Sequence, residues 1–287
     1  ILLSDSITYD ITPPDFVDIA PEAGSYVNSA IVQFTNTEEL SSASVVWERI
    51  EGEEDKNSPH TIDIPSEYFG TGKQETSNII TPDLINGTVY RLTLNGRDLA
   101  GNLSGVVYHN MNYDIKNPEL SIVYPLDKPA NNNTDFGYEL SEQLGSAIIK
   151  YTWLDGVEDG NSPHIINVDQ RSLPEGITER YPLNPAPFLV DGAFYKIELE
   201  GVDRAGNRSN ISIRNSILYD ITKPELSMGI PKEGLVNIGK EISYSISEDL
   251  FESVVIWNRV GGNADENSPH NIKLSVEEKL KGDYELI

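Results

Sequence analysis

The chain contains no cysteine and carries few positive charges. Without cysteine it cannot form a disulfide, a thiolate metal site or a cysteine nucleophile. Its 21 Lys and Arg residues stand against 46 Asp and Glu residues, which gives a net charge of −25 at pH 7 over 287 residues. Such an acidic chain repels nucleic acid and anionic membrane surfaces and attracts cations, so we expect no nucleic-acid partner.

Long apolar runs are also missing. No stretch of 18 apolar residues occurs in the sequence, so we predict no membrane insertion in this segment. Hydrophobic residues still make up 38% of the chain and are spread evenly, which argues against disorder of the whole chain. The chain begins with Ile1 and shows no signal peptide, and we interpret it as a fragment of a protein that continues in both directions.

Three short motifs recur in one register along the chain. They are Tyr-Asp-Ile at residues 9, 113 and 219, Asn-Ser-Pro-His at residues 57, 161 and 267, and Asp-x-Ala-Gly-Asn at residues 98 and 203. The spacings are 104 and 106 for the first two motifs and 105 for the third. A common period of this kind indicates tandem repeats. We predict a last strand of a preceding repeat at 1–8, repeats over 9–112 and 113–218, and an incomplete repeat over 219–287.

Each predicted repeat consists of short segments in which apolar and polar residues alternate, as around Val32 and Phe34. Alternation with period two, many β-branched and aromatic residues, and a repeat length of about 100 residues favour a two-sheet β-sandwich. Trp47, Tyr151 and Trp257 hold one place, ten residues before each Asn-Ser-Pro-His motif. We therefore expect these three side chains at one equivalent buried site.

One motif points to a particular kind of sandwich. The segment from Leu84 to Tyr90 recurs from Leu189 to Tyr195, and both read Leu, two residues, Gly, two residues, Tyr. This resembles the tyrosine corner of fibronectin type III and immunoglobulin-like domains. The Asp-x-Ala-Gly-Asn-x-Ser and Tyr-Asp-Ile-x-x-Pro segments resemble the bacterial immunoglobulin-like repeats of large surface adhesins. The resemblance implies an all-β chain of tandem seven-stranded sandwiches, arranged as beads in a rod, at an extracellular or cell-surface location.

Acidic residues recur at three places in each repeat. In a sandwich of this type the chain enters at one pole, and the turns between strands B and C and between strands F and G return to that pole. Hard oxygen ligands that meet there suit Ca²⁺, and in the adhesin arrays that the sequence resembles, calcium at such junctions stiffens the rod. The predicted ligands are Asp10, Glu38, Asp98 and Asn102 in the first repeat, Asp114, Glu142, Asp203 and Asn207 in the second, and Asp220 and Glu248 in the third.

Ordinary turn chemistry is the alternative explanation of these acids, because Asp and Asn cap turns and Gly supplies positive φ. A further acidic turn carries Asp55, Asp159 and Asp265, two residues before each repeated Asn. The topology sends this turn to the opposite pole, where it could add a ligand for the next linker.

The histidines do not suggest catalysis. His60, His164 and His270 occupy one equivalent position in separate repeats, and His109 stands alone, so the sequence does not gather them into a cluster. A zinc site or a general base needs partners nearby. We interpret Asn-Ser-Pro-His as a turn in which the histidine caps or packs, and we expect that the chain is not an enzyme.

These observations favour a structural stalk or adhesive array of a secreted or cell-surface protein, with calcium at its junctions. Its partners would be the neighbouring repeats, other cell-surface or matrix components, or copies of itself. A subunit of an extracellular filament or surface layer is one alternative. Spacer or carbohydrate-binding modules of a secreted hydrolase are another, and a binding module would expose a row of aromatic side chains. The aromatic residues that decide this point are Tyr68, Phe69, Tyr108 and Tyr181.

Overall fold

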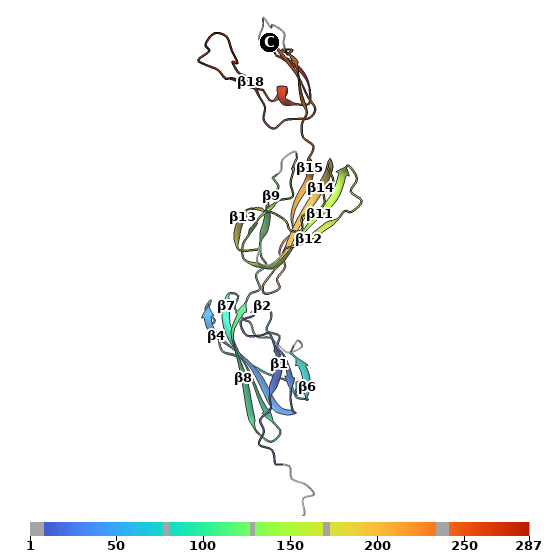
Figure 1. The fold of residues 1–287 in the computed structure, drawn as a ribbon. Helices are drawn as coiled ribbons and strands as arrows, with labels where there is room; N and C mark the ends of the chain where they lie inside the picture. The colour runs from blue at the N-terminus through green and yellow to red at the C-terminus, as the bar shows by residue number, and fades with distance from the viewer. Residues whose placement is uncertain (1–8, 77–80, 127–129, 169–172, 234–240, 287) are drawn as a thin grey trace, which may run out of the picture. The chain divides into compact units, whose positions relative to one another are not determined.

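The computed structural model describes residues 9–76, 81–126, 130–168, 173–233 and 241–286. Residues 1–8, which the sequence assigns to the last strand of a preceding repeat, lie outside this part. The described chain is all-β, as predicted, and its α-helix content is nil over those ranges (Figure 1). It divides into two compact units, residues Ile1–Asp220 and Ile221–Ile287.

The first repeat contains two sheets that face each other. Its strands are antiparallel, except that β2 and β8 run parallel. The smaller sheet has the order β1 (Phe16–Ala20), β3 (Gln33–Asn36), β6 (Gly72–Glu75). The larger sheet has the order β2 (Tyr26–Val27), β8 (Leu103–Tyr113), β7 (Thr88–Asp98), β4 (Leu40–Gly52), β5 (His60–Asp63).

The second repeat follows the same plan inside the same compact unit. Its smaller sheet has the order β13 (Gly176–Tyr181), β10 (Phe136–Leu140), β9 (Leu120–Tyr124). Its larger sheet has the order β12 (His164–Val168), β11 (Leu144–Gly156), β14 (Ala193–Asp203), β15 (Ser212–Tyr219).

The second compact unit holds fewer strands. One sheet has the order β16 (Leu226–Ile230), β17 (Ile242–Ile246), β20 (Gly282–Leu286). The other pairs β18 (Val254–Trp257) with β19 (His270–Lys273). Among the described residues, single turns of 3₁₀ helix occur at Ser66–Tyr68 and Glu277–Lys279.

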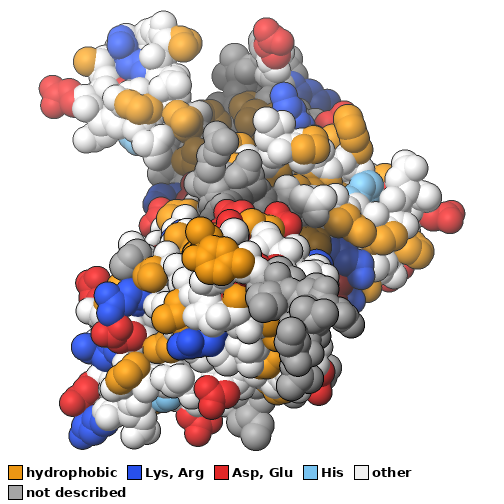
Figure 2. All heavy atoms as spheres, turned by 90° about the horizontal axis from the view of Figure 1, so that it is seen from below, with side chains coloured by type: hydrophobic (Ala, Val, Ile, Leu, Met, Phe, Trp, Pro, Cys, Tyr) orange, Lys and Arg blue, Asp and Glu red, His pale blue; other side chains and the backbone are white. Residues whose placement is uncertain are grey.

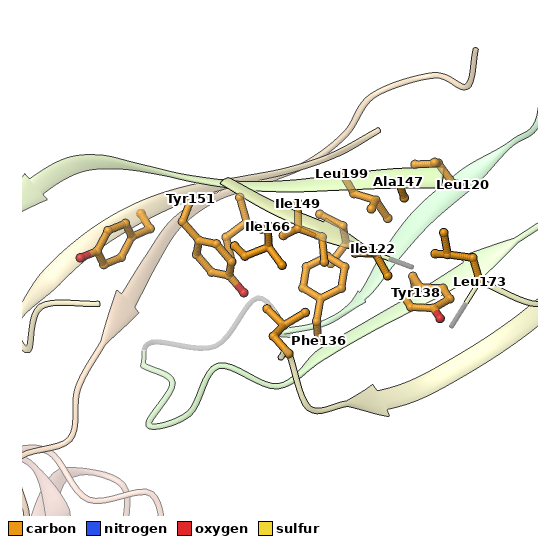
Figure 3. Close-up of a cluster of buried hydrophobic side chains, with 14 of the residues drawn as sticks. Leu120, Ile122, Phe136, Tyr138, Ala147, Ile149, Tyr151, Ile166, Leu173 and Leu199 are labelled. Atoms are coloured by element: carbon orange, nitrogen blue, oxygen red, sulfur yellow. The ribbon is translucent and has the colours of Figure 1, made fainter. Parts of the chain in front are cut away.

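Strict alternation builds the cores. In β7, Tyr90, Leu92 and Leu94 face inward and are at most 1% exposed, while the residues between them reach solvent. Successive strand residues point to opposite faces, so this pattern buries one face of the strand against the opposite sheet. Figure 3 shows the matching core of the second repeat, where Phe136, Tyr138 and Ile149 meet other apolar side chains of both sheets.

The equivalent aromatic site is buried in two repeats and half-buried in the third. Trp47 is 0% exposed and Tyr151 is 3% exposed, as the shared register predicts. The prediction is wrong for Trp257, which is only half-buried. The reason is strand pairing: β4 lies between β5 and β7, and β11 between β12 and β14, whereas β18 pairs with β19 alone in the described part of the second unit.

This difference gives a testable prediction. Trp47→Ala should lower the unfolding free energy of the first repeat by about 3–5 kcal/mol, because it removes a fully buried aromatic ring. Trp257→Ala is the matched control, and it should cost its own unit clearly less. Native-state hydrogen exchange measures both losses region by region. Equal losses would contradict the burial difference.

Candidate metal centre

Strand register brings the turns of each N-terminal pole together. In the first repeat, β4 begins at Leu40, which pairs with Asp98 at the end of β7. In the second repeat, Leu144 at the start of β11 pairs with Asp203 at the end of β14. The turn that precedes β4 or β11 therefore lies beside the turn that follows β7 or β14, and both lie where the chain enters the repeat.

Three carboxylates meet at this pole in each of the first two repeats. Asp10 comes from the linker, Glu38 from the turn between β3 and β4, and Asp98 from the end of β7. One oxygen from each lies within 4.8 Å of the other two. The same geometry holds in the second repeat, and the group there is Asp114, Glu142 and Asp203. The side chains come from places more than 25 residues apart in the chain, so only the fold brings them together.

The aspartate at the end of β7 is the buried member of its group. Asp98 is 1% exposed, and its Oδ1 accepts hydrogen bonds from the backbone nitrogens of Gly101 and Asn102 at 2.6 and 2.8 Å. Asp203 is 4% exposed, and its Oδ1 accepts from the backbone nitrogens of the three residues Ala205 to Asn207 at 2.7–2.8 Å. Each turn is thus folded around its carboxylate.

The electrostatics differ between members of one group. Burial raises the pKa of Asp98, but hydrogen bonds from the Asn102 side chain and from backbone N–H groups outweigh it, so the pKa is lowered overall. Burial raises the pKa of Glu38, and the nearby charges of Asp10 and Asp98 raise it further. The glutamate therefore carries the repulsion of the group, which a bound cation would relieve.

Glu142 has the same environment in the second repeat. Burial is the main cause that raises its pKa, and the negative charges of Asp114 and Asp203 raise it further. The recurrence matters because the two turns differ in sequence: Thr-Glu-Glu-Leu in the first repeat and Ser-Glu-Gln-Leu in the second. Glu38 and Glu142 hold the same position in the two turns, whereas the residue that follows is Glu39 in one turn and Gln143 in the other.

The two predicted amide ligands are placed differently from the expectation. The side-chain nitrogen of Asn102, not its oxygen, faces Asp98 Oδ2 at 2.8 Å, and it also donates to the carbonyl of Asp10 at 3.3 Å. Asn207 donates in the same way to Asp203 Oδ2 at 2.7 Å and to the carbonyl of Asp114 at 2.9 Å. Both acceptors are oxygens without a proton, so each asparagine here ties the linker to the turn and does not offer a ligand oxygen.

Asp220 and Glu248 belong to different compact units, and their predicted meeting stays a prediction. Asp220 ends the first compact unit, and Glu248 follows β17 in the second. The place of the Asp-x-Ala-Gly-Asn motif in a third repeat, about 105 residues after Asp203, falls beyond Ile287.

A second repeated constellation lies between β4 and β5. Asp55 Oδ2 accepts a hydrogen bond from the Tyr90 hydroxyl at 2.7 Å and lies 2.6 Å from His60 Nε2. Asp55 Oδ1 accepts from the backbone nitrogen of Asn57 at 3.0 Å. The Tyr90 oxygen in turn accepts from the backbone nitrogen of Ile85 at 2.9 Å, which is the tyrosine corner that the sequence predicts.

The second repeat contains the same network, with distances that agree to within 0.1 Å. Asp159 Oδ2 accepts from the Tyr195 hydroxyl at 2.7 Å and lies 2.7 Å from His164 Nε2. In the second compact unit, Asp265 keeps its histidine, His270, at 2.8 Å. The Asn-Ser-Pro-His turn thus places its histidine against the aspartate five residues earlier.

This network overturns one expectation about the opposite pole. Asp55 and Asp159 are 7% and 5% exposed, and both oxygens of each carboxylate take part in hydrogen bonds within their own repeat. Unlike Asp98 and Asp203, neither belongs to a group of acids that could hold an ion among the described residues, so they do not add ligands for the next linker. Sequence reasoning missed the pairing because Tyr90 lies 35 residues from Asp55, although the fixed spacing of Asp, Asn and His was a visible signal.

The serine of the motif has a structural place as well. Ser58 Oγ accepts the backbone N–H of Arg49 at 2.7 Å, and Ser162 Oγ accepts that of Trp153 at the same distance. Both donors lie where the pairing register of their strand shifts. A bulge leaves a backbone donor without a ladder partner, and the serine supplies the acceptor.

Aromatic side chains do not form a binding row over the described residues. Tyr68, Phe69 and Tyr108 pack against the first core, and Tyr181 packs against the second. The most exposed aromatic side chains stand one in each repeat: Tyr9, Phe188 and Phe251. Figure 2 shows one face of the molecule, on which Asp and Glu side chains are spread among Lys, Arg and apolar ones.

Comparisons with known proteins give weak likenesses. No family model matches the chain, and no curated protein sequence matches it. The FN1–FN3 domains of chicken CNTN1 are 12% identical with a TM-score of 0.34, over 74% of this chain and 68% of that one. Dimeric latent PorU from Porphyromonas gingivalis is 11% identical with a TM-score of 0.22, and this chain spans 30% of it.

A third solved structure is a Ca²⁺-stabilized adhesin that helps an Antarctic bacterium to reach out and bind ice. It is 10% identical with a TM-score of 0.26, over 95% of this chain and 64% of that one. At this level none of the three establishes a family. No helix in the part of the chain that the structure describes is long and apolar enough to cross a membrane.

The Asp55 network predicts an acid-dependent stability. Hydrogen bonds from Tyr90 and His60 lower the pKa of Asp55 below its ordinary 3.8 although burial alone would raise it. A lowered pKa in the folded state means that the carboxylate stabilises the repeat above pH 3.8, and that this stability is lost as the pH falls through the folded pKa. Tyr90→Phe should cost about 1–3 kcal/mol at pH 7, since it removes one donor to Asp55 and the acceptor for Ile85.

Urea unfolding at a series of pH values between 7 and 2 measures both effects. Tyr90→Phe should also flatten the acid limb of the stability curve of the first repeat, because it removes one cause of the lowered pKa. Tyr108→Phe, on the neighbouring strand, is the matched control and should change neither. An acid limb that keeps its slope in Tyr90→Phe would contradict the network.

Proposed function

We propose that this chain is a structural stalk or adhesive array of a secreted or cell-surface protein, and that calcium stiffens its repeat junctions. The observation that carries the proposal is the recurrence of one carboxylate group at the same pole of two successive repeats. The three contributing places are the linker, the turn before β4 or β11, and the turn after β7 or β14. Turn capping explains the buried aspartate of each group and one oxygen of the linker aspartate, which accepts the backbone N–H of Thr12 or Lys116, but it does not explain the glutamate beside them.

The chemistry of the group favours Ca²⁺. Three carboxylate oxygens within 4.8 Å of one another repel unless a cation lies among them. Ca²⁺ takes six to eight oxygen ligands at irregular angles, so backbone carbonyls and water would complete the shell. Asp10 and Asp114 would hold it from the linker side, while Asp98 and Asp203 would hold it from the folded repeat. A bound ion would therefore fix each linker against its repeat.

The rest of the chain supports a structural role over a catalytic one. The histidines at positions 60, 164 and 270 are paired with aspartates, and the serines at positions 58 and 162 accept backbone hydrogen bonds. We propose that the chain has no catalytic activity of its own and that its first partners are the neighbouring repeats. Turnover of an ester, glycoside or peptide by the purified chain, abolished by a point change within it, would refute this.

Calcium should raise the melting temperature of the purified chain relative to the same chain in chelator. When free calcium is a hundredfold above the dissociation constant, mass action adds about 2.7 kcal/mol to the apparent stability of the binding repeat. Glu38→Gln should lose most of the rise in the first repeat, because it removes one of the three carboxylates. Glu39→Gln is the matched control, since Glu39 is exposed and lies outside the group.

Differential scanning calorimetry with and without calcium measures these shifts. Small-angle scattering on the same samples tests whether the maximum dimension changes with calcium. An unchanged melting temperature and an unchanged dimension, together with equal behaviour of Glu38→Gln and Glu39→Gln, would show that the acids are ordinary turn residues.

A further inference from the structure

We propose that the first two repeats are held together by a joint that needs no metal ion. The joint consists of Tyr26 and Asn28 of the first repeat and Arg204 and Asn207 of the second, closed around linker residue Asp114. The contacts of the joint do not depend on the proposed function; only the use of the joint, to stiffen a stalk, rests on that proposal. Its contacts lie within the first compact unit and involve side chains other than the three carboxylates.

The linker backbone is bound from both sides. The backbone nitrogen of Asp114 donates to the carbonyl of Val27 in the first repeat at 2.9 Å. Its carbonyl accepts from the side-chain nitrogen of Asn207 in the second repeat at 2.9 Å. The next residue, Ile115, donates its backbone N–H to Asn86 Oδ1 of the first repeat at 2.7 Å. A linker whose consecutive polar groups are used in this way has lost the rotations that would let the repeats swing.

Two side-chain contacts join the repeats directly. The guanidinium carbon of Arg204 lies 3.9 Å from the ring centroid of Tyr26, which is close for a cation–π pair. Asn28 donates a side-chain hydrogen bond to Asn207 Oδ1 at 3.1 Å. Asn207 therefore binds the linker with its nitrogen and the first repeat with its oxygen. Both contacts depend on direction as well as distance, so they fix the angle between the repeats.

The equivalent turn of the first repeat serves as an internal comparison. Asn102 holds the place of Asn207, yet it is half-buried whereas Asn207 is 8% exposed. Leu99 holds the place of Arg204 and is 70% exposed. The two turns share their motif and their buried aspartate, so the extra burial of Asn207 comes from the neighbouring repeat that covers it. A leucine cannot form a cation–π contact, so the turn of the first repeat lacks this part of the joint.

The joint and the carboxylate group share one turn but use different residues. Asp203 belongs to the group, and Arg204 beside it belongs to the joint. Removing the Arg204 side chain should therefore loosen the repeats without removing a carboxylate. Calcium and the joint can be tested separately for this reason.

Single-molecule energy transfer between the repeats tests the proposal. The chain has no cysteine, so Thr61→Cys and Glu179→Cys, at exposed positions of the first and second repeats, would carry the only two dyes. In chelator, the parent chain should give one narrow distance distribution. Arg204→Ala should raise the population outside that distribution roughly two- to fivefold, the loss expected for an exposed cation–π contact.

Two further variants keep the test specific. Tyr26→Leu should have the same effect as Arg204→Ala, and the double variant should add little to either, because both remove one contact. Arg208→Ala is the charge-matched control at the end of the same turn, and it should leave the distribution narrow. Circular dichroism of each variant shows that the repeats remain folded.

The outcomes separate the joint from the calcium proposal. The joint would be overturned if, in chelator, the distance distribution of the parent chain were as broad as that of Arg204→Ala. It would also be overturned if the distribution of Arg208→Ala were as broad as that of Arg204→Ala. If calcium changes the distance distribution of neither the parent chain nor Arg204→Ala, while these two distributions differ in chelator, the joint stands and calcium stiffening fails. If calcium narrows the distance distribution of every variant equally, and Arg204→Ala has the same distribution as the parent chain in chelator, the joint fails and calcium stiffening stands.

Discussion

The hydrogen bonds that a buried carboxylate accepts from its own turn organise the N-terminal pole of each of the first two repeats. Asp98 and Asp203 stand at the ends of β7 and β14, and the chain folds back over them so that successive backbone N–H groups point at one oxygen. The turn is fixed by this contact, and Gly101 and Gly206, both at φ +98°, give it the left-handed residue that it requires. The carboxylate group, and the hydrogen bonds from Asn102 and Asn207 to the linker, then rest on a turn that is already rigid.

The chain uses buried aspartate in two different ways. The oxygens of Asp55 and Asp159 are hydrogen-bonded to a tyrosine, a histidine and a backbone N–H, and these bonds hold a turn to the core. Asp98 and Asp203 also have both oxygens hydrogen-bonded, by backbone N–H groups and an asparagine side chain, but in addition they lie among two further acids. A carboxylate surrounded by hydrogen-bond donors stabilises a fold, whereas one that also lies among like charges favours a cation. This contrast within one repeat is the physical reason to assign the structural role to one set and the ionic role to the other.

Much of the fold was predictable because strand patterns are local. Alternating residues such as Tyr90, Leu92 and Leu94 indicate a strand wherever they occur, and the tyrosine corner has a fixed spacing. The meeting of Asp10, Glu38 and Asp98 was predictable only through the topology. The direction of the Asn102 amide was not, because it depends on which oxygens surround it in space. The half-exposure of Trp257 follows from the lack of a second partner strand for β18 among the described residues, in the repeat that the sequence predicts to be incomplete.

The central claim is that each of the two carboxylate groups binds one calcium ion, and a direct count of bound ions tests it. Equilibrium dialysis of the purified chain against about 1 mM free calcium, the range of extracellular modules, measures the ratio of ion to protein. We predict two ions per chain, one for each group, and one ion for a variant with Glu142→Gln. A chain that binds no calcium at this concentration, or that keeps both ions when Glu38 and Glu142 are replaced by glutamine, would contradict it.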